Sequence, residues 1–182
     1  MTFNPCVISK EPIIPRETCG VIIESFAPKT KVVGIGDKNK IVKKTRSTKT
    51  HPIQIEEAED LYALVAGHCN MVNNDIWHFD LVDMEHLQFL EYNPGDHYNY
   101  HLDVGPGKHS TRKLSLVIPL SPIEAYEGGE LLVKIGEKET PVPLKQGHAI
   151  LFPSYILHKV TPVTKGKRFM LVGWMKGKTA FR

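Results

Sequence analysis

Long apolar runs are scarce in this sequence. Stretches of apolar residues rarely reach six, whereas a helix that crosses a bilayer needs roughly 18–20 of them. The opening segment, MTFNPCVISKEPIIP, also lacks the apolar centre of a signal peptide. We therefore expect a cytoplasmic protein that does not enter the membrane.

Cysteine is also scarce, and its spacing forms no pairs. The three cysteines, Cys6, Cys19 and Cys69, are an odd number, and none of them forms a CxxC motif. Neither a disulfide framework nor a cysteine-ligated zinc site is expected from this pattern. All three are predicted to be reduced structural thiols.

Acidic residues are almost absent from one stretch of the chain. Between positions 29 and 50 the sequence carries eight lysines and arginines against Asp37 alone, although the formal net charge of the whole chain is only +3. Such a run is typical of a solvated surface segment, and it also occurs where proteins bind nucleic acid or acidic partners. The stretch has no aromatic side chain on which a base could stack, so nucleic acid is not the expected partner.

Length and hydrophobicity are sufficient for one well-formed core. With 182 residues, 41% of them hydrophobic, the chain is expected to form a single domain over 1–182. Helical spacing predicts a first helix over 15–26, between Pro15 and Pro28, and a second over 55–72. The residues expected to face the core are Val21, Ile22 and Phe26 in the first helix and Ala58, Leu61, Leu64 and Val65 in the second.

From position 76 onward the pattern changes to short β segments separated by Gly, Pro and Asn. These segments, with no helix between them, are 76–82, 87–92, 97–104, 112–120, 129–135, 149–153, 158–162 and 168–174. The paired glycines Gly128 and Gly129 are expected to form a turn between strands. Many short strands favour a sandwich or barrel. The predicted fold is mostly β with N-terminal helices, in which about 1–75 supports a β core of about 76–182.

The segment GDHYNYHLDVG, residues 95–105, concentrates side chains that bind metals. Successive side chains of a strand point to opposite faces, so His101 and Asp103 would project the same way. His158 supplies a third donor from a second apolar strand. Two imidazoles and one carboxylate form the facial triad that binds Fe(II) and leaves open positions. The same donors suit zinc, although no HExxH motif accompanies them.

Arg168 follows His158 by ten residues, across a turn rich in Pro, Thr and Gly. The short connection predicts that the two strands are antiparallel neighbours. An arginine in an apolar interior is costly unless a carboxylate meets it, and a dicarboxylate cosubstrate would supply that partner. The alternative is a surface position on an edge strand. If the face points inward, the residues it carries are Arg168, Met170, Val172 and Trp174.

Over about residues 86–175 the chain resembles the Fe(II)- and 2-oxoglutarate-dependent dioxygenases of the prolyl 4-hydroxylase group, and especially the bacterial PKHD-type hydroxylases. The resemblance rests on five ordered segments: YNPGDHYNYHLD, RKLSLVIPLS, YEGGEL, LKQGHAILFPSYILH and VTPVTKGKR. It implies a double-stranded β-helix, or jelly-roll, core. It also implies Fe(II) as the metal, 2-oxoglutarate as cosubstrate and ascorbate as reductant.

The resemblance assigns roles to five residues near the reaction centre. The implied iron ligands are His101, Asp103 and His158. Arg168 would hold the distal carboxylate of 2-oxoglutarate, and Tyr92 would lie close to the cosubstrate.

Other residues are implied as walls of the substrate pocket. Trp174 and Tyr98 would line it, although simple alternation along the strand places Tyr98 on the face opposite the first metal histidine. Pro119 stands where related enzymes carry an aromatic residue, often Tyr, that helps the arginine hold the cosubstrate. Proline cannot donate that hydrogen bond, so Ser115 or a water is expected to replace it.

The implied activity is hydroxylation of a C–H bond by O₂, coupled to conversion of 2-oxoglutarate to succinate and CO₂. A proline-containing peptide is the first expected substrate, because 37–50 corresponds to a substrate-covering loop of prolyl hydroxylases. The alternatives are an oxygenase acting on nucleic acid or on a free amino acid, and a non-enzymatic cupin-like binding module. Cupins usually carry His where Asp103 stands. Nucleic-acid demethylases carry a second arginine soon after the first, whereas Arg168 is followed next by Arg182.

Overall fold

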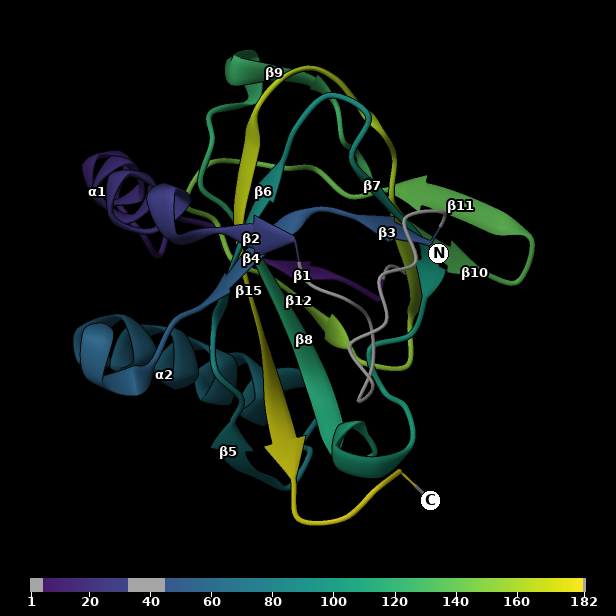
Figure 1. The fold of residues 1–182 in the computed structure, drawn as a ribbon. Coiled ribbons are helices and arrows are strands. Elements are labelled where there is room, and N and C mark those ends of the chain that lie inside the picture. Colours follow the sequence, from purple (N-terminus) through teal and green to yellow (C-terminus); the bar gives the residue numbers. More distant parts are fainter. Residues whose placement is uncertain (1–4, 33–44, 182) are drawn as a thin grey trace.

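The computed structural model describes residues 5–32 and 45–181. Strands dominate these ranges, and two α-helices lie on one side of them (Figure 1). The basic stretch 29–50 is described only at its two ends, so most of the loop predicted over 37–50 lies outside the described residues. Within the described ranges, none of the helices is both long and apolar enough to cross a membrane.

Helix α1 spans Arg16–Phe26. It starts after Pro15, whose fixed φ suits the first turn of a helix, and it is followed by a 3-10 turn at Ala27–Lys29 that contains Pro28. Val21 was predicted to face the core but is 61% exposed, because it lies at the outer edge of the apolar stripe. The buried side chains of the helix are Cys19, Ile22 and Phe26.

Helix α2 spans Glu59–Ile76. It begins later than predicted because Ile55–Glu57 form a separate 3-10 turn, closed by a capping box between Gln54 and Glu57. The predicted core face is partly wrong, since Leu64 is 45% exposed. Val65 is buried as predicted, and it belongs to a row with helical spacing: Tyr62, Val65, Cys69, Val72 and Asn73.

The larger sheet has the strand order β1-β12-β8-β15-β6-β4-β2, and β5 pairs with one end of β15. All of these pairs are antiparallel. The bounds, in chain order, are β1 Val7–Ile8, β2 Lys31–Val32, β4 Lys49–Pro52, β5 Leu81–Met84, β6 Gln88–Tyr92, β8 Arg112–Pro119, β12 Ile150–Pro153 and β15 Arg168–Gly177.

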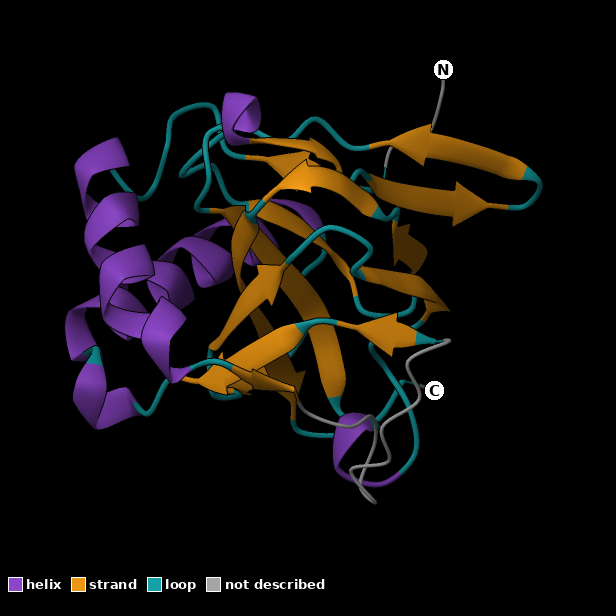
Figure 2. Cartoon of the chain, turned by 45° about the horizontal axis from the view of Figure 1, so that its top comes forward, coloured by secondary structure: helices purple, strands orange, loops and turns teal. Residues whose placement is uncertain are grey.

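The smaller sheet has the order β11-β10-β13-β7-β3, and a separate pair joins β14 to β9. The bounds are β3 Arg46–Ser47, β7 His97–His101, β9 Tyr126–Gly128, β10 Leu131–Ile135, β11 Lys138–Pro141, β13 Leu157–Val160 and β14 Val163–Gly166. Figure 2 shows the two α-helices together on one side of the strands. The arrangement is mostly β with N-terminal helices, as predicted.

Alternation along the strands produces two apolar clusters. In β15, Leu171 and Met175 belong to the cluster shared with α1 and α2, whereas Met170 packs with residues of the smaller sheet such as Leu131 and Val133. Side chains on one face of the larger sheet therefore pack against the helices, and those on the other face line the space between the two sheets.

Two strand predictions are wrong. The segment 76–82 is not one strand, because Ile76 ends α2 and β5 starts at Leu81. The strands that carry His158 and Arg168 are not neighbours either, since β13 lies between β10 and β7 while β15 lies between β8 and β6. Between them, β14 pairs with β9 and leads the chain from one sheet to the other.

Candidate active site

A cavity of about 460 Å³ opens between the two sheets. It brings together residues from distant parts of the sequence, and seven of the eight predicted site residues line it: Tyr92, Tyr98, His101, Asp103, His158, Arg168 and Trp174. The eighth, Ser115, is buried behind the wall. The predicted inward face of β15 is present, because Arg168, Met170, Val172 and Trp174 all line the cavity.

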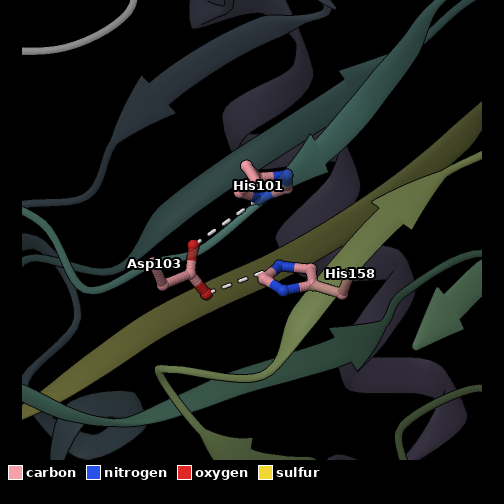
Figure 3. Close-up of side chains that lie close together, drawn as sticks. All are labelled: His101, Asp103 and His158. Atoms are coloured by element: carbon pink, nitrogen blue, oxygen red, sulfur yellow. Dashed lines mark ion pairs between the residues drawn. The ribbon is translucent and has the colours of Figure 1, made fainter. Parts of the chain in front are cut away.

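The metal-binding candidates converge at one end of the cavity. His101 and His158 are register partners on the neighbouring strands β7 and β13. One ligand atom from each of His101, Asp103 and His158 lies within 4.8 Å of the others. The Asp103 carboxylate lies beside both rings, with each oxygen 3.6 Å from the Nε2 atom of one histidine (Figure 3).

The sequence predicted that strand alternation directs Asp103 to this point, but the structure shows a different cause. Strand β7 ends at His101, and Asp103 lies in the bend that follows. Its backbone N–H donates to the carbonyl of Ser154 at 3.0 Å. The bend is therefore anchored to the segment between β12 and β13, and this contact holds the carboxylate toward both imidazoles.

Further hydrogen bonds orient the three side chains. The Nδ1 atoms of His101 and His158 each lie 2.8 Å from the backbone carbonyl two residues earlier in the chain. With Nδ1 as the donor, Nε2 is unprotonated and directed at the common point. The hydroxyl of Ser115 donates to Asp103 Oδ2 at 2.6 Å, and Ser154 lies 3.0 Å from that hydroxyl.

The pKa shifts of His101 and Asp103 suit metal binding. Burial, and to a lesser extent the charge of His158, lowers the pKa of His101 to about 4. Burial alone would raise the pKa of Asp103, but the charges of the two histidines and hydrogen bonds from Ser115 and Trp174 outweigh it, so this pKa lies below its ordinary value. A neutral imidazole and an ionised carboxylate are the forms that bind a divalent cation. The donor set fits Fe(II).

Arg168 is a buried cation at another part of the cavity wall. It is only 1% exposed, which rules out the surface position, and its guanidinium lies 4.8 Å from the centre of the Tyr92 ring. Its Nε atom has no hydrogen-bond acceptor, and no described carboxylate forms an ion pair with it. A buried, unpaired guanidinium is unfavourable, so the position is suited to a ligand carboxylate.

Tyr98 lies on the cavity side with His101, against the simple alternation of the strand. The pairing of β13 with β7 is irregular: His158 pairs with His101 and Val160 pairs with Tyr98. Two steps on one strand therefore oppose three on the other, which is a β-bulge. The bulge turns the Tyr98 ring onto the His101 ring, with centroids 3.5 Å apart and planes 11° from parallel.

Ser115 does not replace the aromatic residue that the resemblance expects at Pro119. Pro119 pairs with Met170, whereas Ser115 pairs with Trp174 farther along β8 and β15. The Ser115 hydroxyl donates its hydrogen bond to Asp103, so it orients a candidate metal ligand and does not contact Arg168. The structure leaves Arg168 with Tyr92 as its aromatic neighbour.

Sequence reasoning missed several polar residues of the wall. These are Arg46, Thr50, Gln88, Lys108 and Arg112. Arg112 binds Glu85 through Nε at 2.9 Å and Nη2 at 2.6 Å, and it also donates to the Asp103 carbonyl at 3.2 Å. Its guanidinium stacks 3.8 Å from the Trp174 ring centre. No local pattern marks these residues, because their partners are far away in the sequence.

The β core of the chain matches a known protein family. A family described as the 2OG-Fe(II) oxygenase superfamily matches residues 87–176. A PKHD-type hydroxylase of Hyphomonas neptunium is 44% identical over 86 residues, which cover 45% of this chain and 38% of the relative. PKHD-type hydroxylase IL0759 of Idiomarina loihiensis is 36% identical over 85 residues, covering 47% and 39%. The chain spans about two fifths of the length of these curated relatives.

Solved structures share the whole described fold. A prolyl-4-hydroxylase of Pseudomonas putida matches with a TM-score of 0.76 and 20% identity, covering 96% of this chain and 93% of that chain. A prolyl hydroxylase of Trichoplax adhaerens, solved with a hypoxia inducible factor oxygen degradation domain peptide fragment, matches with a TM-score of 0.78 and 18% identity, covering 96% and 84%. These structures have the double-stranded β-helix fold, which confirms the predicted core.

Proposed function

Since residues 87–176 of this chain belong to the 2OG-Fe(II) oxygenase superfamily, we propose that the protein hydroxylates a substrate C–H bond. One oxygen atom of O₂ enters the substrate as hydroxyl, and the other enters succinate as 2-oxoglutarate loses CO₂. The family uses Fe(II) and 2-oxoglutarate. The observation that carries the proposal is that one cavity holds both the His101, Asp103 and His158 cluster and the unpaired cation Arg168.

Each residue of the site has a proposed task. His101, Asp103 and His158 would hold Fe(II), which supplies the centre at which O₂ is activated. The carbonyls that accept from the histidines fix their ring orientation. Arg168 would bind the distal carboxylate of 2-oxoglutarate through its planar fork, and stacking on Tyr92 limits rotation of that fork.

The rest of the cavity wall restricts water and positions the substrate. Apolar side chains of both sheets line it, among them Leu131, Met170 and Val172. They would exclude water from the reacting centre, which suppresses side reactions. Trp174 is held between Arg112 and the Asp103 region and would form a rigid wall for the substrate.

The substrate we propose is a proline-containing peptide. Two structural relatives are named prolyl hydroxylases, and one of them was solved with a peptide fragment. A free amino acid and a nucleic acid remain the alternative substrates. Ascorbate is proposed as the reductant that keeps the metal as Fe(II). The single-domain organisation over 1–182 and the cytoplasmic location stay predictions.

Purified protein supplied with Fe(II), 2-oxoglutarate, ascorbate and air is expected to release succinate slowly even without substrate. The reason is that metal and cosubstrate sites lie in one preformed cavity. Succinate is measured by mass spectrometry, and proline-containing peptides are screened for a gain of one oxygen, about 16 Da, a product of the transfer reaction. Protein treated with a chelator and protein under nitrogen serve as controls. Equal succinate in all samples would contradict an oxygenase.

Replacing Gly129 with alanine is expected to weaken 2-oxoglutarate binding by about tenfold, the effect of roughly one disturbed charge-assisted hydrogen bond. Gly129 has φ +63°, and an added Cβ would lie 2.8 Å from Arg168 Cδ and 3.0 Å from Val163 Cγ2. The methyl group would therefore push the arginine side chain from its place. Anaerobic titration of 2-oxoglutarate into the Fe(II)-loaded variant measures the effect.

Gly136→Ala is the matched control for this substitution. Gly136 has a similar φ of +57°, but an added Cβ meets nothing within 4 Å. Both variants carry the same kind of backbone strain, about 1 kcal/mol in unfolding free energy, so both should melt at a lower temperature. Only Gly129→Ala should also lose cosubstrate affinity. An equal affinity of the two variants would show that Arg168 does not depend on this turn.

A further inference from the structure

A second arginine reaches the cavity from the edge of the smaller sheet. Arg46, in β3, is the register partner of Tyr98 in β7, and it lines the cavity. Its guanidinium lies 5.1 Å from the centre of the Tyr98 ring, and that ring stacks on His101 at 3.5 Å. The Tyr98 ring therefore contacts the Arg46 guanidinium and also the His101 ring, which belongs to the candidate metal site.

The charges of the cavity wall leave Arg46 without a counterion. Among the described lining residues Asp103 is the sole carboxylate, and it is committed to the metal cluster. Arg112 is neutralised by Glu85, Lys108 has an interaction of its own, and Arg168 is matched to the cosubstrate. Arg46 forms no ion pair in the described ranges, and its buried Nε has no hydrogen-bond acceptor.

We infer that Arg46 recognises a carboxylate of the substrate close to the carbon that is hydroxylated. A buried guanidinium N–H without an acceptor is unfavourable, and a carboxylate satisfies it through a charge-assisted pair. Cosubstrate and substrate would thus use different arginines, Arg168 on β15 of the larger sheet and Arg46 on β3 of the smaller one. The inference rests on the proposed function and specifies its substrate as an acidic peptide.

Two sources within a peptide could supply this carboxylate. One is the side chain of an aspartate or glutamate next to the target residue, and the other is the terminal carboxylate of a target at the C-terminus. Both present the same planar anion to the fork of Arg46. Peptides that differ only in these groups separate the two sources.

The test is a binding measurement on the Fe(II)- and 2-oxoglutarate-loaded protein under nitrogen, where no turnover occurs. The peptides are end-blocked Ala-Ala-Asp-Pro-Ala-Ala and Ala-Ala-Pro-Asp-Ala-Ala, the same peptides with Asn or Lys in place of Asp, and Ala-Ala-Pro with a free or an amidated C-terminus. Wild-type protein is expected to bind one acidic form at least about tenfold more tightly than its neutral counterpart, as one charge-assisted contact implies.

Variants at Arg46 assign that preference. Arg46→Gln should lose it, Arg46→Lys should keep part of it, and Arg46→Glu should reverse it toward the Lys peptides. A residue that only packs on Tyr98 would not reverse the charge preference. Lys165→Gln is the control, because Lys165 is outside the cavity wall and its side chain is 77% exposed; this variant should keep the wild-type preference.

The outcomes separate this inference from the proposed function. Equal or unmeasurable binding of acidic and neutral peptides by the wild type overturns the inference, and so does an unchanged acidic preference in Arg46→Glu. The same peptides are then incubated in air. Binding that depends on Arg46 without any oxygenated product supports the carboxylate site and counts against peptide hydroxylation.

Discussion

Replacing His158 with alanine is expected to abolish metal binding and turnover. The side chain is only 5% exposed and supplies one of the three donors that converge on a single point. Loss of a residue that merely orients a ligand costs about 10- to 100-fold in metal affinity, so loss of the ligand itself should cost more than about 100-fold. Equilibrium dialysis of Fe(II) under nitrogen measures the affinity.

The fold of this variant is expected to remain. Strand β13 is held by backbone pairing with β10 and β7, which does not involve the imidazole. The variant does lose the ring contacts to Phe152 and His101, so a moderate fall in melting temperature is expected without loss of the far-ultraviolet circular dichroism spectrum.

His148→Ala is the matched control for metal binding. His148 is a half-buried histidine whose Nδ1 lies 2.9 Å from the Ser9 carbonyl, and it does not line the cavity. Its removal should leave Fe(II) affinity unchanged. Wild-type affinity in His158→Ala would remove this residue from the ligand set.

The fold class was predictable because alternation and turn residues are local signals. The strand segments 87–92, 112–120 and 168–174 agree closely with β6, β8 and β15. Element limits and partners depend on contacts between distant residues. Ile76, predicted to start a strand, is the last residue of helix α2. Strands β13 and β15 lie in different sheets with β14 between them in the sequence, although the short connection had predicted that they are neighbours.

The site illustrates the same division. The spacing of His101 and Asp103 predicted that the two side chains lie close together, but the geometric reason was wrong. The strand ends before Asp103, and a backbone hydrogen bond to Ser154 holds Asp103 near His101. The position of Tyr98 depends on a bulge that is defined by pairing with another strand. Arg46 was noticed only as part of a basic run, since its place beside Tyr98 follows from sheet pairing.

Replacing Arg168 with alanine is expected to remove most of the affinity for 2-oxoglutarate while Fe(II) binding survives. The variant loses a bidentate contact and leaves the distal carboxylate buried without a partner, which costs roughly 3–5 kcal/mol. This corresponds to about two to three decades or more in the dissociation constant. Arg168→Lys should recover part of the loss, because the charge remains while the planar fork is absent.

Two measurements check this prediction against a neighbouring cation. Anaerobic titration of 2-oxoglutarate into Fe(II)-loaded protein gives the affinity, and the rise in melting temperature with added 2-oxoglutarate, which follows from preferential binding to the folded state, should vanish in Arg168→Ala. Lys167→Ala is the control, because Lys167 pairs with Glu91 and its side chain is 59% exposed. An affinity of Arg168→Ala within a factor of about three of wild type would show that the buried guanidinium does not hold the cosubstrate.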